Sequence, residues 1–462
     1  MAMEQPIIKT GSTSEDSHHF EEDYSPLHLA RAQRQLAPIQ QIDHGHEVIE
    51  TSLRTNYGEQ TLETTTSIME MEESFRQSLL NNHSLMQRVP KMIMTSKHSW
   101  NLVAEITTLS LENSKVSCLS GIQCFKGLTT IYLNDTQVED ISPLSECTKL
   151  MSLFLFNTLV SDLTPLSKCT MLQELYLSQC PVSDISSLSS CANLTILDLD
   201  NTKVSDISAL SKAKELTELY LENSHVCSIS PLTCCTKLTK LWLSNTPIVD
   251  LTRISTCTRL SKLGLTKTQI TDISPLSFLS NLKFLWIQST KVCDISPLSS
   301  CVQLIELFSD ETNVSDISPL FHCTQLTTLS LNWTLVSDIS LLRFCSHLTN
   351  LSMKDTRVVD ISSLSRCSHL TKLCLQGTLV EDITPLSSCI QLKELRLSNT
   401  KVSDVSSLSA CTKLSYLWLE NTLVSDVSPL CTCTQLTKLY IRNTKVLNLD
   451  SLSHMKRLRI YK

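Results

Sequence analysis

The sequence predicts an α/β solenoid, in which short parallel strands line one side of a stack of coils and short helical turns line the other. Three observations predict it. A motif of 22 residues repeats from Ile106 to Arg457 with no insertion or deletion. Apolar residues alternate at the start of each repeat, as in a strand with one buried face. A Ser-Pro pair occurs later in many repeats, where a short helical turn would begin.

The strand comes first in each repeat. Numbered from 1 to 22, the pattern reads L-x-x-L-x-L-x-x-T-x-V-x-D-I-S-P-L-S-x-C-x-x. Apolar residues at positions 4 and 6, such as Ile131 and Leu133, share one face of a strand, whereas positions 3, 5 and 7 point the other way. Positions 11, 14 and 17 are also apolar. One repeat cannot bury all of them alone, so sixteen repeats, followed by a stub that opens at Leu458, must stack around one continuous core.

The helical turn comes second. Positions 15 and 16, as in Ser142 and Pro143, resemble an N-cap followed by proline in the first helical position. They predict a short 3₁₀ turn or a single α-turn over positions 16–20. Thr136 and its equivalents at position 9 offer a side chain that can bond to the backbone as the strand ends. Because 22 residues leave no room for a long helix, each coil is strand, turn, short helical turn and return.

The L-x-x-L-x-L motif resembles the leucine-rich repeat signature. Its 22-residue spacing with V-x-D-I-S-P-L resembles the internalin-like and phosphatase-regulator-like classes, and the threonine at position 9, where asparagine is usual, resembles leucine-rich repeats of kinetoplastid protozoa. The resemblance covers about three quarters of the chain. It implies a right-handed arc with the parallel sheet on its concave face, and it implies a surface that holds proteins.

Position 5 lies at the middle of the strand face that points away from the core. Nine of its sixteen residues are aromatic, whereas aromatic residues make up 5% of the chain. They are predicted to bind a protein partner, because tyrosine and tryptophan are favoured at interaction sites. The alternative is that the rings stack along the strands and stabilise the sheet without a ligand. The predicted binding residues are Tyr132, Phe154, Tyr176, Tyr220, Trp242, Trp286, Phe308, Trp418 and Tyr440.

Twelve of the twenty cysteines occupy position 20, from Cys147 to Cys433. Free cysteine behaves as a small buried apolar residue, so the column is predicted to be part of the core. An oxidising compartment would endanger such a column, which favours a reducing one. Zinc is the weaker interpretation, because neither the Cys234–Cys235 pair nor the Cys431–Cys433 pair has a second pair at zinc spacing. No metal and no cofactor is expected.

Aspartate fills position 13 in thirteen repeats, from Asp140 to Asp426. The favoured interpretation is that each carboxylate closes an Asx turn ahead of position 15; a row of calcium ligands is the alternative. No enzyme signature is present. The sequence has seven glycines, no phosphate-binding glycine-rich loop, and neither G-K-[ST] nor H-E-x-x-H.

The organisation of the chain follows from this pattern. Residues 1–60 are predicted to be a disordered polar and acidic tail, residues 61–105 a helical N-terminal cap or a partner-binding helix, and residues 106–462 the repeat domain. Residues 1–100 carry eight basic and fourteen acidic residues, a net charge of −6, which leaves −1 of the total of −7 for the remainder. Neither part has the basic excess of a nucleic-acid binder.

Together these features predict a non-catalytic protein–protein interaction scaffold or regulatory subunit. Its partner is a protein held on the concave face; its oligomeric state is left open. No apolar run could cross a membrane, and no secretory signal or lipid anchor is recognised, so the expected location is the cytoplasm, or the nucleus. The alternatives are an internalin-type surface adhesin and a subunit that regulates a phosphatase or a cyclase.

Overall fold

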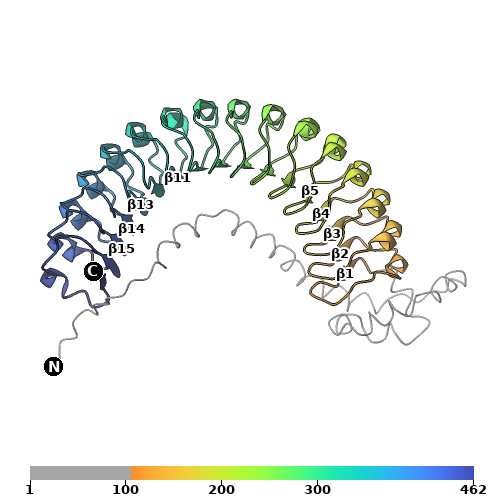
Figure 1. Cartoon of the computed structure of the whole chain (residues 1–462), viewed down its shortest axis with the longest axis horizontal. Helices are drawn as coiled ribbons and strands as arrows, with labels where there is room; N and C mark the ends of the chain where they lie inside the picture. Colours follow the sequence, from red (N-terminus) through yellow and green to blue (C-terminus); the bar gives the residue numbers. More distant parts are fainter. Residues whose placement is uncertain (1–105) are drawn as a thin grey trace, which may run out of the picture. The chain divides into compact units, whose positions relative to one another are not determined.

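The computed structural model describes residues 106–462, so the predicted tail and N-terminal cap lie outside the described residues. Residues 106–462 form a regular stack of coils, each with a short strand on the inner side and a 3₁₀ turn on the outer side (Figure 1). The solenoid prediction is therefore confirmed. Every coil has the same two elements in the same order, because every coil has the same 22-residue pattern.

The strands make one parallel sheet of seventeen, in which each strand pairs with the next along the chain. Each strand covers positions 3–5, and each pair joins residues 22 apart, as in Leu241 with Leu263. The strands are β1 (Thr108–Ser110), β2 (Thr130–Tyr132), β3 (Ser152–Phe154), β4 (Glu174–Tyr176), β5 (Ile196–Asp198), β6 (Glu218–Tyr220), β7 (Lys240–Trp242), β8 (Lys262–Gly264), β9 (Phe284–Trp286), β10 (Glu306–Phe308), β11 (Thr328–Ser330), β12 (Asn350–Ser352), β13 (Lys372–Cys374), β14 (Glu394–Arg396), β15 (Tyr416–Trp418), β16 (Lys438–Tyr440) and β17 (Arg459–Tyr461).

The outer side consists of 3₁₀ turns. They are η5 (Ile122–Cys124), η6 (Ser142–Glu146), η7 (Thr164–Lys168), η8 (Ser186–Ser190), η9 (Ser208–Lys212), η10 (Ser230–Cys234), η11 (Thr252–Thr256), η12 (Ser274–Phe278), η13 (Ser296–Ser300), η14 (Ser318–His322), η15 (Ser340–Phe344), η16 (Ser362–Arg366), η17 (Thr384–Ser388), η18 (Ser406–Ala410), η19 (Ser428–Thr432) and η20 (Asp450–Leu452). From η6 to η19 the turns cover positions 15–19, one residue earlier than the sequence predicts.

The aspartate at position 13 explains this earlier start. Ser142 is the first residue of η6, not its cap, and Ile141 takes the cap position without a side-chain bond. The Oδ1 atom of Asp140 accepts the backbone N–H of Ser142 at 2.7 Å. The predicted Asx turn is therefore present, and its carboxylate supplies the acceptor that the serine was expected to supply.

The core is a continuous column of apolar side chains between the sheet and the turns. Residues at positions 1, 4, 6, 11, 14, 17 and 20 of successive coils join one cluster that runs from Leu109 to Ile460. Ser309 is the polar exception at position 6. It is fully buried, and its hydroxyl lies 2.9 Å from that of Thr312. The strand register on both sides of β10 is unbroken.

The last step of the ladder is one residue short. Leu439 pairs with Ile460, and Tyr440 pairs with Tyr461, so the strand spacing falls from 22 to 21 at β17. A one-residue slip exchanges the two faces of a strand. Ile460 is therefore buried in the core, and Tyr461 joins the column of position 5, where strict spacing would have placed Lys462.

Candidate functional site

The nine predicted binding residues all lie on the inner strands, and all lie outside the hydrophobic core cluster. Their side chains alternate with core leucines such as Leu241 and Leu285, which are fully buried on the opposite face of the same strands. Seven of the nine have small exposed fractions, for example 5% for Trp242 and for Trp286, whereas Tyr176 and Trp418 are half-buried. Their assignment as a binding surface stays a prediction.

The first aromatic stack is formed by strands β2 to β4. The ring centroids of Tyr132 and Phe154 lie 4.5 Å apart, and those of Phe154 and Tyr176 lie 4.6 Å apart, with nearly parallel planes. The strand register imposes this stacking, because it places the three Cα positions directly side by side. Each ring therefore covers part of its neighbour.

The second group, the central aromatic cluster, consists of Trp242, Phe284, Trp286 and Phe308. The Trp286 ring stacks at 6.1 Å on Phe284, two residues earlier in the same strand, and at 6.1 Å on Phe308 of the next strand. The Trp242 ring reaches Trp286 across β8, with centroids 4.7 Å apart. The Nε1 atom of Trp286 is buried and finds no hydrogen-bond acceptor among residues 106–462. Such a donor is unusual, because buried indole N–H groups are normally bonded.

The third stack closes the sheet at its C-terminal end. Trp418 and Tyr440 lie 5.3 Å apart, and Tyr440 and Tyr461 lie 4.4 Å apart, both nearly parallel. The guanidinium of Arg396 lies over Trp418 at 4.4 Å. Tyr461 could not be assigned to position 5 from the sequence, because it does not follow the constant 22-residue step.

A polar segment separates the second and third groups. Position 5 holds Ser330, Ser352 and Cys374 here, as the interruption of the aromatic column indicates. The carboxylate of Asp310 accepts the Ser330 hydroxyl at 2.5 Å and the backbone N–H of Asn332 at 2.8 Å. Burial raises the pKa of Asp310 to about 6, although these two hydrogen bonds oppose the rise.

Ion pairs and cation–π contacts surround the aromatic groups. Lys240 and Glu218 lie 2.7 Å apart on neighbouring strands, and Glu218 also accepts the hydroxyl of Tyr220 at 2.6 Å. The Lys262 ammonium lies over the ring of Phe284 at 4.8 Å. The charges at position 3 are thus already paired with each other or with the rings of the aromatic groups.

Position 8 is a second regular column, which sequence analysis did not identify. Its residue adopts a left-handed conformation in all sixteen coils. Asparagine occupies half of these positions, and asparagine accepts this conformation better than most residues do. Neighbouring asparagines also bond to each other, as when Asn245 Nδ2 donates to Asn223 Oδ1 at 2.7 Å. The repeated asparagine was the available signal.

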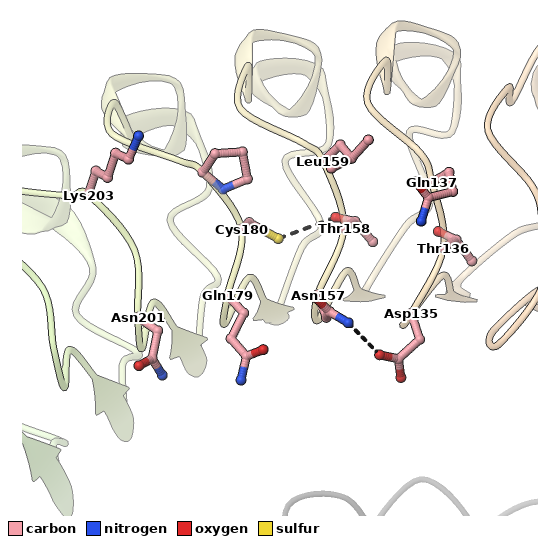
Figure 2. A pocket seen from close by; sticks show the side chains of 11 residues that line it. Asp135, Thr136, Gln137, Asn157, Thr158, Leu159, Gln179, Cys180, Asn201 and Lys203 are labelled. Carbon is pink, nitrogen blue, oxygen red and sulfur yellow. Dashed lines mark hydrogen bonds between the residues drawn. The ribbon is translucent and has the colours of Figure 1, made fainter.

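Four coils next to the first stack share a shallow hollow of about 410 Å³ beside the position-8 column. Figure 2 shows its lining, in which Asn157 donates to Asp135 at 2.8 Å and the Thr158 hydroxyl lies 3.3 Å from the Cys180 sulfur. Both of these contacts join side chains of adjacent coils. The polar groups of the hollow therefore hold neighbouring coils together, and we do not assign it as a ligand site.

The cysteine column is part of the core, as predicted. Its thiols donate to carbonyls of the preceding coil, as Cys191 does to Leu166 at 3.5 Å. Burial raises the pKa of Cys169 to about 12, so its thiol stays protonated at neutral pH. None of the cysteines whose side chains are described forms a disulfide. Within residues 106–462, no group of three or more His, Cys, Asp or Glu side chains could hold a metal ion.

The threonine at position 9 has the role that its chemistry suggests. The Thr136 hydroxyl donates to the carbonyl of Leu133 at 2.7 Å, and the threonines at position 9 of other coils, such as Thr202 and Thr422, make the same bond.

In the described part of the chain, no helix has the length and apolar character needed to cross a membrane.

Comparisons with known proteins agree with this architecture. A family model for leucine-rich repeats in two copies matches residues 170–212, 258–300 and 390–432. Internalin InlF from Listeria monocytogenes is 28% identical, with a TM-score of 0.60, over 73% of this chain and 94% of that one. The functional domain of InlJ from the same bacterium, which includes a cysteine ladder, is 23% identical, with a TM-score of 0.65, over 74% of each chain.

A third similar structure is a plant peptide hormone receptor, RGFR1, in complex with RGF2. It is 18% identical, with a TM-score of 0.59, over 78% of this chain and 71% of that one. No curated protein sequence matches the chain significantly. The 22-residue motif, the parallel sheet with its 3₁₀ turns, and these matches lead to one conclusion: the chain is a leucine-rich repeat protein.

Proposed function

We propose that this protein is a non-catalytic scaffold or regulatory subunit that binds a protein partner on its concave sheet. The observation that carries the proposal is the central aromatic cluster around Trp242 and Trp286. Its rings lie outside the core, and the buried Nε1–H of Trp286 has no acceptor among residues 106–462. A donor of this kind suits a carbonyl group of a bound polypeptide, because leaving it unbonded costs about 1–3 kcal/mol.

The fold supports the same kind of function. Leucine-rich repeats are typical interaction modules, and the similar structures include a receptor solved with a peptide hormone. A parallel sheet of short strands offers side chains at regular spacing, so one partner can contact several coils at once. The stacked rings are rigid, which lowers the entropy that is lost when a partner binds.

We also propose that the protein works in a reducing compartment, such as the cytoplasm. Its support is the column of buried thiols, in which an interior cysteine has two equivalent neighbours and no unique disulfide partner. The exposed thiols of Cys118, Cys227, Cys293 and Cys431 favour the same environment. An internalin-type adhesin is the alternative that the similarity to InlF favours; localisation of the tagged full chain separates the two.

The binding test compares three variants of the full chain. Proximity labelling with the wild type supplies candidate partners, and each candidate is then purified and titrated. Trp242→Ala/Trp286→Ala should weaken binding at least tenfold, since buried tryptophans at an interface each contribute about 2 kcal/mol or more. Trp286→Phe keeps the ring and removes the N–H, and should weaken binding severalfold.

The matched control is Trp333→Ala, because Trp333 is also a tryptophan of the repeat domain but lies at position 8, outside the cluster. It should bind as the wild type does. Circular dichroism must show all variants folded. If the folded double variant binds every purified candidate as tightly as the wild type, the cluster only stabilises the sheet and the proposed surface is wrong.

A further inference from the structure

Cys234 and Cys235 bring two thiols together at the end of η10. Their sulfur atoms lie 3.7 Å apart. Both sulfurs approach the carbonyl of Leu210 in the preceding coil, Cys234 at 3.4 Å and Cys235 at 4.0 Å. Cys235 belongs to the buried column, whereas Cys234 is only partly buried. One residue of the pair is therefore partly exposed to solvent, and the other is buried with its sulfur in contact with the first.

The repeat geometry explains why the two sulfurs meet. In other coils the side chain at position 19 also lies beside the thiol at position 20: the Ser190 hydroxyl is 4.0 Å from the Cys191 sulfur, and the Thr256 hydroxyl is 4.0 Å from the Cys257 sulfur. The coil that begins at Leu216 is the one repeat in which both positions are cysteine. A second thiol thus replaces a hydroxyl at a place that the fold already holds against the column.

The distance favours a bridging atom over a direct disulfide. Adjacent Cα atoms are about 3.8 Å apart across a trans peptide, below the range of about 4.4–6.8 Å that disulfides usually span. If one atom bonded both sulfurs at about 2.3 Å, the length of a zinc–thiolate bond, the 3.7 Å between the sulfurs would give a sulfur–centre–sulfur angle of about 107°. That angle suits a tetrahedral or pyramidal centre.

We infer that Cys234 and Cys235 form a two-thiolate binding site for a thiophilic centre that bonds both sulfurs, of which a trivalent arsenical with one organic group is the best match. Soft thiolates select soft centres. No third His, Cys, Asp or Glu completes a metal group among the described residues. A centre that needs only two protein ligands is therefore the one that this pair can hold.

The binding step balances without a change of oxidation state. An organoarsenic oxide, R–As=O, reacts with two thiols, forms two As–S bonds, and releases its oxygen with both thiol protons as one water. Cys234 reacts first because it is the more exposed residue of the pair. Burial raises the pKa of Cys235, so its thiol loses its proton only as the second As–S bond forms.

The test uses phenylarsine oxide with the full chain under native conditions. The wild type should bind one equivalent and gain the mass of the reagent less one water. Excess glutathione should leave the adduct in place, and a small dithiol should remove it. Cys234→Ser and Cys235→Ala should each lose the glutathione-resistant adduct. Both changes suit the fold, since Ser190 and Ala213 occupy the corresponding positions 19 and 20 in the two preceding coils.

The matched control is Cys431→Ser, which removes an exposed thiol near a column cysteine, Cys433, and should bind as the wild type does. If Cys234→Ser keeps the glutathione-resistant adduct, or if the wild type forms none, the inference is wrong. The readout is reagent binding alone. Its outcome is therefore independent of whether the concave sheet binds a protein.

Discussion

The rings of Trp242 and Trp286 lie 4.7 Å apart although a whole strand separates the two residues. The residue between them in the register is Gly264, and the Trp242 ring occupies the space that a side chain would fill. A Cβ built on Gly264 would lie 2.4 Å from Cε3 of Trp242. The glycine therefore joins two tryptophans into one cluster.

Gly264→Ala should separate the two rings. Because the methyl group overlaps the Trp242 ring, that ring must rotate away from Trp286, and we expect destabilisation of about 1–3 kcal/mol. Near-ultraviolet circular dichroism should show loss of the tryptophan signal, and urea unfolding should show the lower midpoint. Ser110→Ala, at the same position of the first coil, is the control. An unchanged spectrum in Gly264→Ala would contradict the packing described here.

Asp310 should make stability depend on pH. Its folded-state pKa, about 6, lies above the ordinary value of about 3.9. The folded chain therefore holds the proton more tightly, and this contribution is full below about pH 4 and lost as the pH rises through 6. Urea unfolding at pH 4.5 and pH 7.5 should show a smaller difference in Asp310→Asn than in the wild type. A larger difference in the variant would reverse the predicted sign.

Trp333 should be a strained residue. Its φ of 54° is left-handed, which costs a bulky side chain about 1–2 kcal/mol. The Lys354 ammonium over its ring, at 4.3 Å, returns only part of that cost. Trp333→Asn should thus raise the free energy of unfolding by roughly 0.5–1 kcal/mol, seen as a higher urea midpoint. The reciprocal change, Asn399→Trp, should lower it, and equal signs for the two would refute the explanation.

Ser309→Leu should stabilise the core. Position 6 is apolar in every other coil, and Ser309 is fully buried between Ile287 and Leu331 of the adjacent coils. The Thr312 hydroxyl keeps a bond to the Ser309 carbonyl, at 2.7 Å, after the change. We expect a gain of about 1–2 kcal/mol from the added apolar surface. Ser309→Ala, which fills nothing, is the comparison, and a lower midpoint for leucine than for alanine would indicate overpacking instead.

Most of the fold could be predicted because the same pattern of apolar and polar residues occurs in sixteen repeats. Alternation placed Ile131 and Leu133 in the core, and the position-20 cysteines behaved as apolar residues. The predicted turn began one residue too late because serine and aspartate can both accept a backbone N–H at a helix start, and only the structure shows that Asp140 does so. Periodicity cannot reveal which of two suitable side chains makes a bond.

The candidate site was only partly predictable for a related reason. A column lists which residues share a face, but not how their rings arrange themselves. Gly264 lies at position 5 of its repeat, and only the structure shows that its missing side chain lets Trp242 reach Trp286. Tyr461 was missed because its placement depends on a single lost residue near the end of the ladder.

The uniform register has a consequence for how this family of chains can change in length. Since each coil presents to the next the same backbone donors and acceptors that it receives from the one before, a whole coil can be added or removed in frame and the cut ends will still match. A gain or loss of any other length has to be absorbed within one coil, as the 21-residue step to β17 is absorbed by a one-residue shift of that strand. Whole coils of 22 residues are therefore the units in which this molecule can lengthen or shorten without disturbing its ladder.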